Sequence, residues 1–175
     1  MTWQPGNRAA ASLPSFELLF LISSPQTSRV NGVPSEVPAH VKAHATGRWA
    51  EIIFRALSSR VATRWQFVSF RGKGKGEWRG VVDVLAVRKN TAQPTQHGLK
   101  RGDLLEVVLI QVKGGSARAP TSNDCERLRQ VAKIHRARAV VLFSWKRGNN
   151  STFSQLNLRT LQWQPVENAA AIFAA

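Results

Sequence analysis

Two apolar runs, residues 81–87 and 104–112, contain or border polar side chains that a buried strand tolerates only when they are paired. Asp83 lies within the first run, and Gln111 and Lys113 lie at the end of the second. Because side chains alternate along a strand, Gln111 and Lys113 share one face of their strand. The pairing of the two runs must therefore bring these groups together or leave a carboxylate buried alone.

An antiparallel hairpin with Arg88 opposite Glu106 also places Asp83 opposite Gln111. Each polar side chain then has a polar partner across the strands. A slip of one residue would lose the charge pair and turn the apolar side chains to the other face. We therefore predict that an acid, an amide and the amine of Lys113 meet at one end of this hairpin.

Hydrophobic periodicity predicts the remaining elements. Residues 45–61 show helical spacing, with Trp49 and Ile52 among the apolar positions, and residues 64–70 form a strand. Asn123 and Glu126 have the spacing of a capping box and predict the start of a second helix.

Residues 139–145 then form a short apolar strand, parallel to its neighbour because a helix crossover precedes it, and residues 152–166 add one or two edge strands. The predicted order is helix, three strands, helix, strand, which is an α/β domain with a mixed sheet.

Asp83 followed by Gln111-Val112-Lys113 resembles the pattern of the PD-(D/E)xK nuclease superfamily, and within it the Mrr-like branch, where Gln can replace the acid of the triplet. A helix containing Gly47 and Glu51 precedes these residues, as in that family, and a Gly-rich turn before the Asp is similar to that of Holliday junction resolvases. The resemblance covers about residues 41–150 and implies a restriction-endonuclease-like core. Val stands before Asp83, where the family has Pro.

The proposed catalytic set is Glu51, Asp83, Gln111 and Lys113. The Asp83 carboxylate and the Gln111 amide oxygen are suitable ligands for Mg²⁺, or for Mn²⁺ in its place. Lys113 could orient or deprotonate the attacking water and stabilise the charge on the phosphate. The resemblance further implies a main-chain carbonyl ligand at Val112 and an assisting acid at Glu51.

Each of these residues also has an ordinary structural explanation. Asp83 could be a structural acid paired with a nearby cation, and Gln111 a hydrogen-bonded residue at a strand end. Lys113 could be an exposed lysine that closes its strand. Glu51 could be a solvent-exposed residue that pairs with Arg55 on the same helix. The sequence leaves these alternatives open.

The basic residues predict a polyanionic partner. The net charge is +15, and because residues 1–40 carry no net charge, the whole excess lies in residues 41–175. Nucleic acid is the most common partner of such a domain, and a ribosomal or membrane-surface protein is the alternative. No stretch approaches the roughly 18 apolar residues of a membrane-spanning helix. The residues predicted to contact a nucleic-acid backbone are Lys73, Lys75, Arg79, Lys100 and Arg101.

With 175 residues, the chain is most simply a single domain. We predict a poorly ordered N-terminal arm over residues 1–40, a nuclease-like domain over 41–166 and a C-terminal tail over 167–175. The single cysteine, Cys125, excludes an intrachain disulfide, fits a cytoplasmic protein and argues against a zinc site.

The predicted function is a metal-dependent endonuclease or exonuclease that hydrolyses DNA. The alternative is a non-catalytic nucleic-acid-binding protein that keeps the nuclease fold but has lost tight metal binding through Gln111. The sequence leaves open the DNA structure that is cut, the preference for DNA or RNA, and the oligomeric state, a homodimer included.

Overall fold

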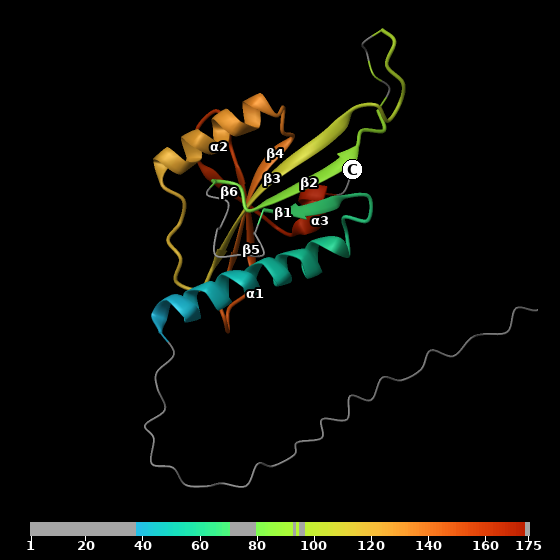
Figure 1. Cartoon of the computed structure of the whole chain (residues 1–175). Coiled ribbons are helices and arrows are strands. Elements are labelled where there is room, and N and C mark those ends of the chain that lie inside the picture. The colour runs from blue at the N-terminus through green and yellow to red at the C-terminus, as the bar shows by residue number, and fades with distance from the viewer. Residues whose placement is uncertain (1–37, 71–79, 93, 95–96, 174–175) are drawn as a thin grey trace, which may run out of the picture. The chain divides into compact units, whose positions relative to one another are not determined.

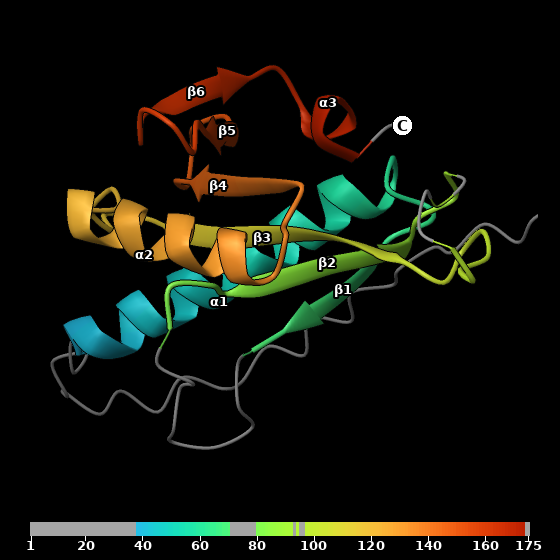
Figure 2. The same ribbon diagram turned by 90° about the horizontal axis from the view of Figure 1, so that it is seen from above.

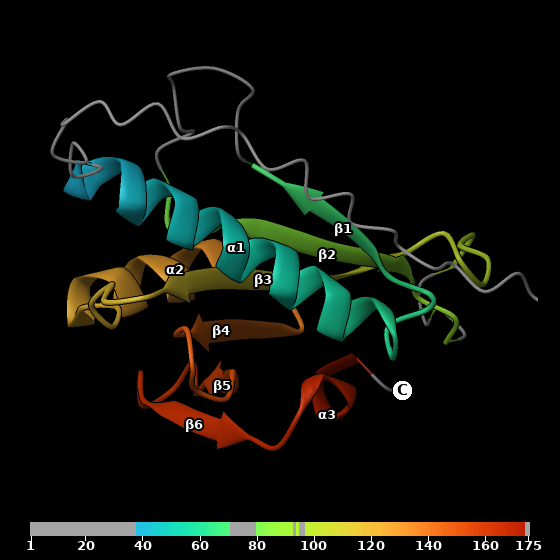
Figure 3. The ribbon, with the colours of Figure 1, turned by 90° about the horizontal axis from the view of Figure 1, so that it is seen from below.

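The computed structural model describes residues 38–70, 80–92, 94 and 97–173, and its centre is a six-stranded sheet in the order β1-β2-β3-β4-β5-β6. Two long helices, α1 (Ala39–Ser59) and α2 (Ser122–Ile134), cover opposite faces of this sheet (Figure 1). Helix α2 lies in front of the strands in Figure 2, and α1 lies in front of them in Figure 3. The fold therefore belongs to the α/β class, as predicted.

The strands are β1 (Gln66–Ser69), β2 (Val84–Lys89), β3 (Leu105–Gly114), β4 (Ala139–Trp145), β5 (Thr152–Leu156) and β6 (Trp163–Val166). Strand β4 runs parallel to β3 through the α2 crossover, and the other neighbours pair antiparallel. The predicted element order, the parallel β4 and the added edge strands are confirmed. A short helix α3 (Ala169–Phe173) follows β6.

The register between β2 and β3 is the one predicted. Arg88 lies opposite Glu106, and every other pair in the ladder follows the same spacing. At the closed end of the hairpin, the main-chain NH of Asn90 donates a hydrogen bond to the carbonyl oxygen of Leu104 at 2.8 Å. Charge pairing and the alternation of apolar residues thus favour one register.

The alternation of side chains divides the core into two clusters. Val108, Ile110 and Val112 of β3 belong to the cluster covered by α1. Leu109 belongs to the cluster that includes Leu128 of α2. Gln111 and Lys113 lie two and four residues after Leu109, on the same face of β3. Both therefore face the α2 side of the sheet.

The buried face of α1 differs from the one predicted. Trp49 and Ile52, expected among the buried apolar positions, are 58% and 45% exposed. Ala50, Glu51 and Phe54 are buried instead. The hydrophobic pattern alone gave the wrong rotation of the helix because its apolar residues are spread over more than one face.

A close contact between α1 and β3 accounts for this rotation. A Cβ atom added at Gly114 would lie 2.7 Å from the carbonyl oxygen of Thr46 and 3.0 Å from the Cβ of Ala50. The side of α1 that carries Thr46 and Ala50 can therefore rest on the end of β3 only because residue 114 has no side chain.

Helix α2 begins earlier than predicted. Thr121 is the N-cap, its hydroxyl accepts the main-chain NH of Asp124 at 3.2 Å, and Asp124 Oδ2 accepts the main-chain NH of Thr121 at 3.0 Å. The predicted capping box of Asn123 and Glu126 is therefore wrong, and Glu126 pairs with Arg129 at 2.7 Å. Two overlapping capping-box spacings compete here, and the helix starts at the first.

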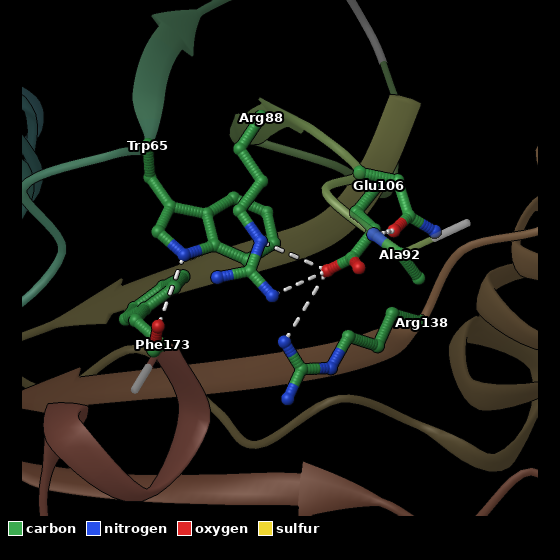
Figure 4. Close-up of polar contacts among 7 residues, drawn as sticks. Trp65, Arg88, Ala92, Glu106, Arg138 and Phe173 are labelled. Atoms are coloured by element: carbon green, nitrogen blue, oxygen red, sulfur yellow. Dashed lines mark hydrogen bonds and ion pairs between the residues drawn. The ribbon is translucent and has the colours of Figure 1, made fainter. Parts of the chain in front are cut away.

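At the closed end of the hairpin, the charged groups are paired with one another (Figure 4). Glu106 Oε2 accepts hydrogen bonds from Nε and Nη2 of Arg88 at 2.9 and 2.7 Å, and Arg138 Nη1 lies 3.4 Å away. The Arg88 guanidinium also lies 4.6 Å from the centre of the Trp65 ring. The Trp65 indole NH donates to the carbonyl oxygen of Phe173 at 3.1 Å, which ties α3 to the core. These contacts stabilise this end of the sheet.

Candidate active site

Asp83 lies directly before β2, at the open end of the hairpin. Its main-chain NH donates to the carbonyl oxygen of Ile110 at 2.9 Å, and its carbonyl oxygen accepts the NH of Phe70 at 3.1 Å. Its carboxylate Oδ2 accepts the main-chain NH of Val112 at 2.7 Å. The carboxylate is therefore fixed at the level of the sheet, beside β3 and before β2 begins.

The main-chain groups of Val112 point toward this carboxylate. In an antiparallel ladder, alternate residues direct both their NH and their C=O to the same neighbouring strand. Ile110, two residues earlier, accepts its hydrogen bond from Asp83 on the β2 side. The NH of Val112 turns the same way, and its carbonyl oxygen is therefore directed to the β2 side of β3.

The ladder between β2 and β3 ends with Val84 opposite Ile110, and the main-chain NH of Asp83 also bonds to Ile110. Gln111 is the next residue of β3, and its side chain is buried, with 6% of the residue exposed. Its amide oxygen Oε1 has no hydrogen-bond partner in the described part of the chain. A buried hydrogen-bond acceptor without a partner lowers the stability of the folded state by about 1–3 kcal/mol. Such atoms in native proteins commonly have a functional explanation or contact a bound water or ion.

Lys113 lies on the same face, two residues beyond Gln111, and is half-buried beside Ser144 of the parallel strand β4. The first turn of α2 is close to it. The pKa of Asp124 is lowered, first by the hydrogen bond from the Thr121 main chain, then by the Thr121 hydroxyl, and to a smaller extent by the positive charge of Lys113. Asp124 is thus occupied in capping α2.

Glu51 is buried, so the alternative of a solvent-exposed glutamate is wrong. Its Oε1 lies 3.5 Å from Nε of Arg55, one turn later in α1. It approaches the sheet from the α1 side, whereas Gln111 and Lys113 face α2. The Asp83 carboxylate lies between these two faces at the level of the sheet.

The predicted nucleic-acid contacts fall into two groups. Lys73, Lys75 and Arg79 lie outside the described residues. Lys100 and Arg101 are exposed in the connection between β2 and β3, at the closed end of the hairpin. Six residues of β2 separate that end from Asp83, a length of about 20 Å.

The sequence interpretation overlooked polar residues on the strands beyond β3. Ser144 of β4 lies beside Lys113, and Thr152 of β5 lies opposite Ser144. Both therefore share the α2 face with Gln111. The signal was present, because Ser144 interrupts the apolar run 139–145 much as Asp83 interrupts its own run.

The donor set at the open end of the hairpin fits a hard divalent cation. It comprises the Asp83 carboxylate, the unpartnered Gln111 amide oxygen and the Val112 carbonyl, all oxygen donors of the kind that Mg²⁺ prefers. Within the described ranges, no group of three or more His, Cys, Asp or Glu side chains gathers at one place. A cation here would therefore depend on neutral oxygen donors as well as on Asp83.

No protein-family model, curated protein or solved structure matches the chain. In the part of the chain that the structure describes, no helix combines the length and apolar character required to cross a membrane.

Proposed function

We propose that the chain is a metal-dependent nuclease of the PD-(D/E)xK type, with a restriction-endonuclease-like core, that hydrolyses phosphodiester bonds in DNA. The observation that carries this proposal is the unpartnered buried oxygen of Gln111, next in sequence to Val112, whose NH binds the Asp83 carboxylate, and on the same face as Lys113. A buried acceptor without a protein partner commonly contacts a bound water or ion, which supports a cation at this position.

Asp83, Gln111 and the Val112 carbonyl would hold Mg²⁺ or Mn²⁺. When bound, the cation supplies positive charge that stabilises the anionic transition state of hydrolysis. The hydrogen bond from the Val112 NH fixes the Asp83 carboxylate before substrate arrives, so little reorganisation is needed.

Lys113 provides the mobile positive charge of the site. Its ammonium group donates hydrogen bonds to the attacking water or to a phosphate oxygen, on the face where Gln111 also lies. Glu51 approaches from the opposite face and would accept a proton or a hydrogen bond from water beside Asp83. The basic excess of residues 41–175 favours a nucleic acid as substrate.

The test is incubation of the protein with Mg²⁺ or Mn²⁺ and supercoiled, linear, single-stranded, methylated or four-way-junction DNA. We expect cleavage of at least one substrate, and a loss of at least ~100-fold in rate for Asp83→Asn and for Lys113→Ala. Lys133→Ala removes an exposed lysine from α2 and serves as the control. Near-wild-type cleavage by either site variant, with circular dichroism unchanged, would remove these residues from the site.

The competing function is nucleic-acid binding without catalysis, which the neutral Gln111 favours because an amide binds a cation less strongly than a carboxylate does. In that case no substrate is cut, and Mg²⁺ does not raise the melting temperature, as it must when a folded protein binds an ion. Both functions predict DNA affinity that falls steeply with salt. An affinity independent of salt would contradict a nucleic-acid partner altogether.

A further inference from the structure

A pocket of about 220 Å³ opens beside Lys113, where β3 and β4 end and β5 begins. Its lining residues are Lys113, Gly115, Ala117, Ser144, Trp145, Lys146, Asn149, Asn150 and Thr152. The register places Lys113 beside Ser144 and Ser144 opposite Thr152, so three neighbouring strands each contribute a polar side chain to one face. The pocket therefore continues the polar face that begins with Gln111.

The lining has the chemistry of an anion site. It contains two lysines, two hydroxyl groups and two amide side chains, but no Asp or Glu. Asp124, whose pKa is lowered in small part by Lys113, is held by Thr121 at the start of α2. Lysine ammonium groups with nearby hydroxyl and amide donors suit a phosphate group.

The volume favours a small group over a cofactor. Pockets for drug-sized ligands measure about 300–1,000 Å³, and this pocket lies below that range. A sugar-phosphate unit of a nucleic-acid strand is therefore a better fit than a free nucleotide cofactor.

The position of the pocket relates it to the proposed cleavage site. Strand β4 is two strand spacings from β2, or roughly 10 Å, because neighbouring strands lie about 4.8 Å apart. Lys113 lines the pocket and also belongs to the proposed catalytic set, so a phosphate held in the pocket would lie close along the strand to the scissile phosphate.

We propose that this pocket binds a backbone phosphate of the cleaved DNA strand, close to the scissile phosphate, through Lys146 and the hydroxyls of Ser144 and Thr152. This inference rests on the proposed nuclease function. The pocket would hold the strand across the ends of β3, β4 and β5 and so determine which phosphate reaches Asp83 and Lys113.

The test compares Lys146→Ala with Arg147→Ala. Both side chains are exposed, basic and adjacent in the β4–β5 connection, but only Lys146 lines the pocket. Binding of a fluorescent DNA oligonucleotide is measured without divalent ions at several salt concentrations. Loss of one phosphate contact should lower the salt slope by about one for Lys146→Ala and leave that of Arg147→Ala at the wild-type value.

A second variant, Ser144→Ala, removes a pocket hydroxyl without changing the charge. We expect it to weaken binding several-fold, and under cleavage conditions to raise KM or shift the cut position while kcat changes little. If Lys146→Ala and Arg147→Ala weaken binding equally and Ser144→Ala has no effect, the pocket is not a phosphate site, even when cleavage is normal. Failure of every DNA substrate to be cut would instead contradict the nuclease function, and the binding comparison would still decide whether the pocket holds phosphate.

Discussion

Gly114→Ala would place a methyl group where α1 rests on β3. The new Cβ would lie 2.7 Å from the Thr46 carbonyl oxygen, closer than real Cβ atoms approach their neighbours, and 3.0 Å from the Cβ of Ala50, which is a tight contact. The obstacle is largely main chain, which a rotamer change cannot move. Helix α1 must therefore shift away from the sheet.

The expected size of the effect follows from two opposing terms. Overpacking of this kind costs about 1–3 kcal/mol. Replacing Gly by Ala stabilises the folded state by about 0.4–1 kcal/mol because the unfolded chain loses conformational freedom. We expect a net loss of about 1–2 kcal/mol in the free energy of unfolding, or roughly 2–8 °C in melting temperature for a chain of this size.

Thermal and urea unfolding, followed by circular dichroism, measure this loss. Gly80→Ala is the control, because its new Cβ would meet its nearest neighbour at 3.9 Å, which is ordinary contact. Gly98→Ala separates main-chain strain from contact, since Gly98 has φ +84° and nothing within 4 Å. If Gly114→Ala is as stable as Gly80→Ala, α1 does not rest on residue 114 and the explanation for the rotation of α1 is wrong.

Three further predictions concern charge. Gln111→Glu should tighten Mg²⁺ binding, which is measured as a larger rise of the melting temperature with Mg²⁺, and the rate of DNA cleavage should stay the same or increase. If the variant is destabilised and Mg²⁺ does not restore its stability, Gln111 is not part of the site. Glu106→Gln should lower the free energy of unfolding by about 2 kcal/mol, because it weakens charge-assisted hydrogen bonds to the largely buried Arg88. Glu126→Gln in α2, whose partner Arg129 is more exposed, should change the free energy of unfolding little. Equal effects of the two substitutions in urea unfolding would contradict this prediction. The pKa of Asp124 lies below its ordinary value of 3.8, chiefly because of hydrogen bonds from Thr121. The stability advantage of wild type over Asp124→Asn should therefore be complete above about pH 4 and disappear as the pH falls through the lowered pKa. An advantage that does not shrink as the pH is lowered below about 4 would refute this prediction.

The element order and the β2–β3 register followed from the sequence. Strand side chains repeat every two residues, and the Arg88–Glu106 pair excludes neighbouring registers, so local pattern and one charge pair were sufficient. That register brings Asp83 to the end of β3, where it contacts the main chain of Ile110 and Val112. The crossover helix likewise required a parallel β4.

The rotation of α1 could be decided only by tertiary contact. Trp49 and Ile52 suggested one buried face, but the absence of a side chain at Gly114 allowed another face to approach β3, which buried Glu51. The start of α2 at Thr121 was likewise a choice between two equally good local signals.

The pocket beside Lys113 also depends on tertiary structure, because its lining comes from strand ends brought together by sheet order. Periodicity places residues on a face of one strand, whereas neighbours across strands depend on the pairing of segments distant in sequence. The unpartnered oxygen of Gln111 has the same origin, since whether a buried polar atom finds a partner depends on every element packed around it.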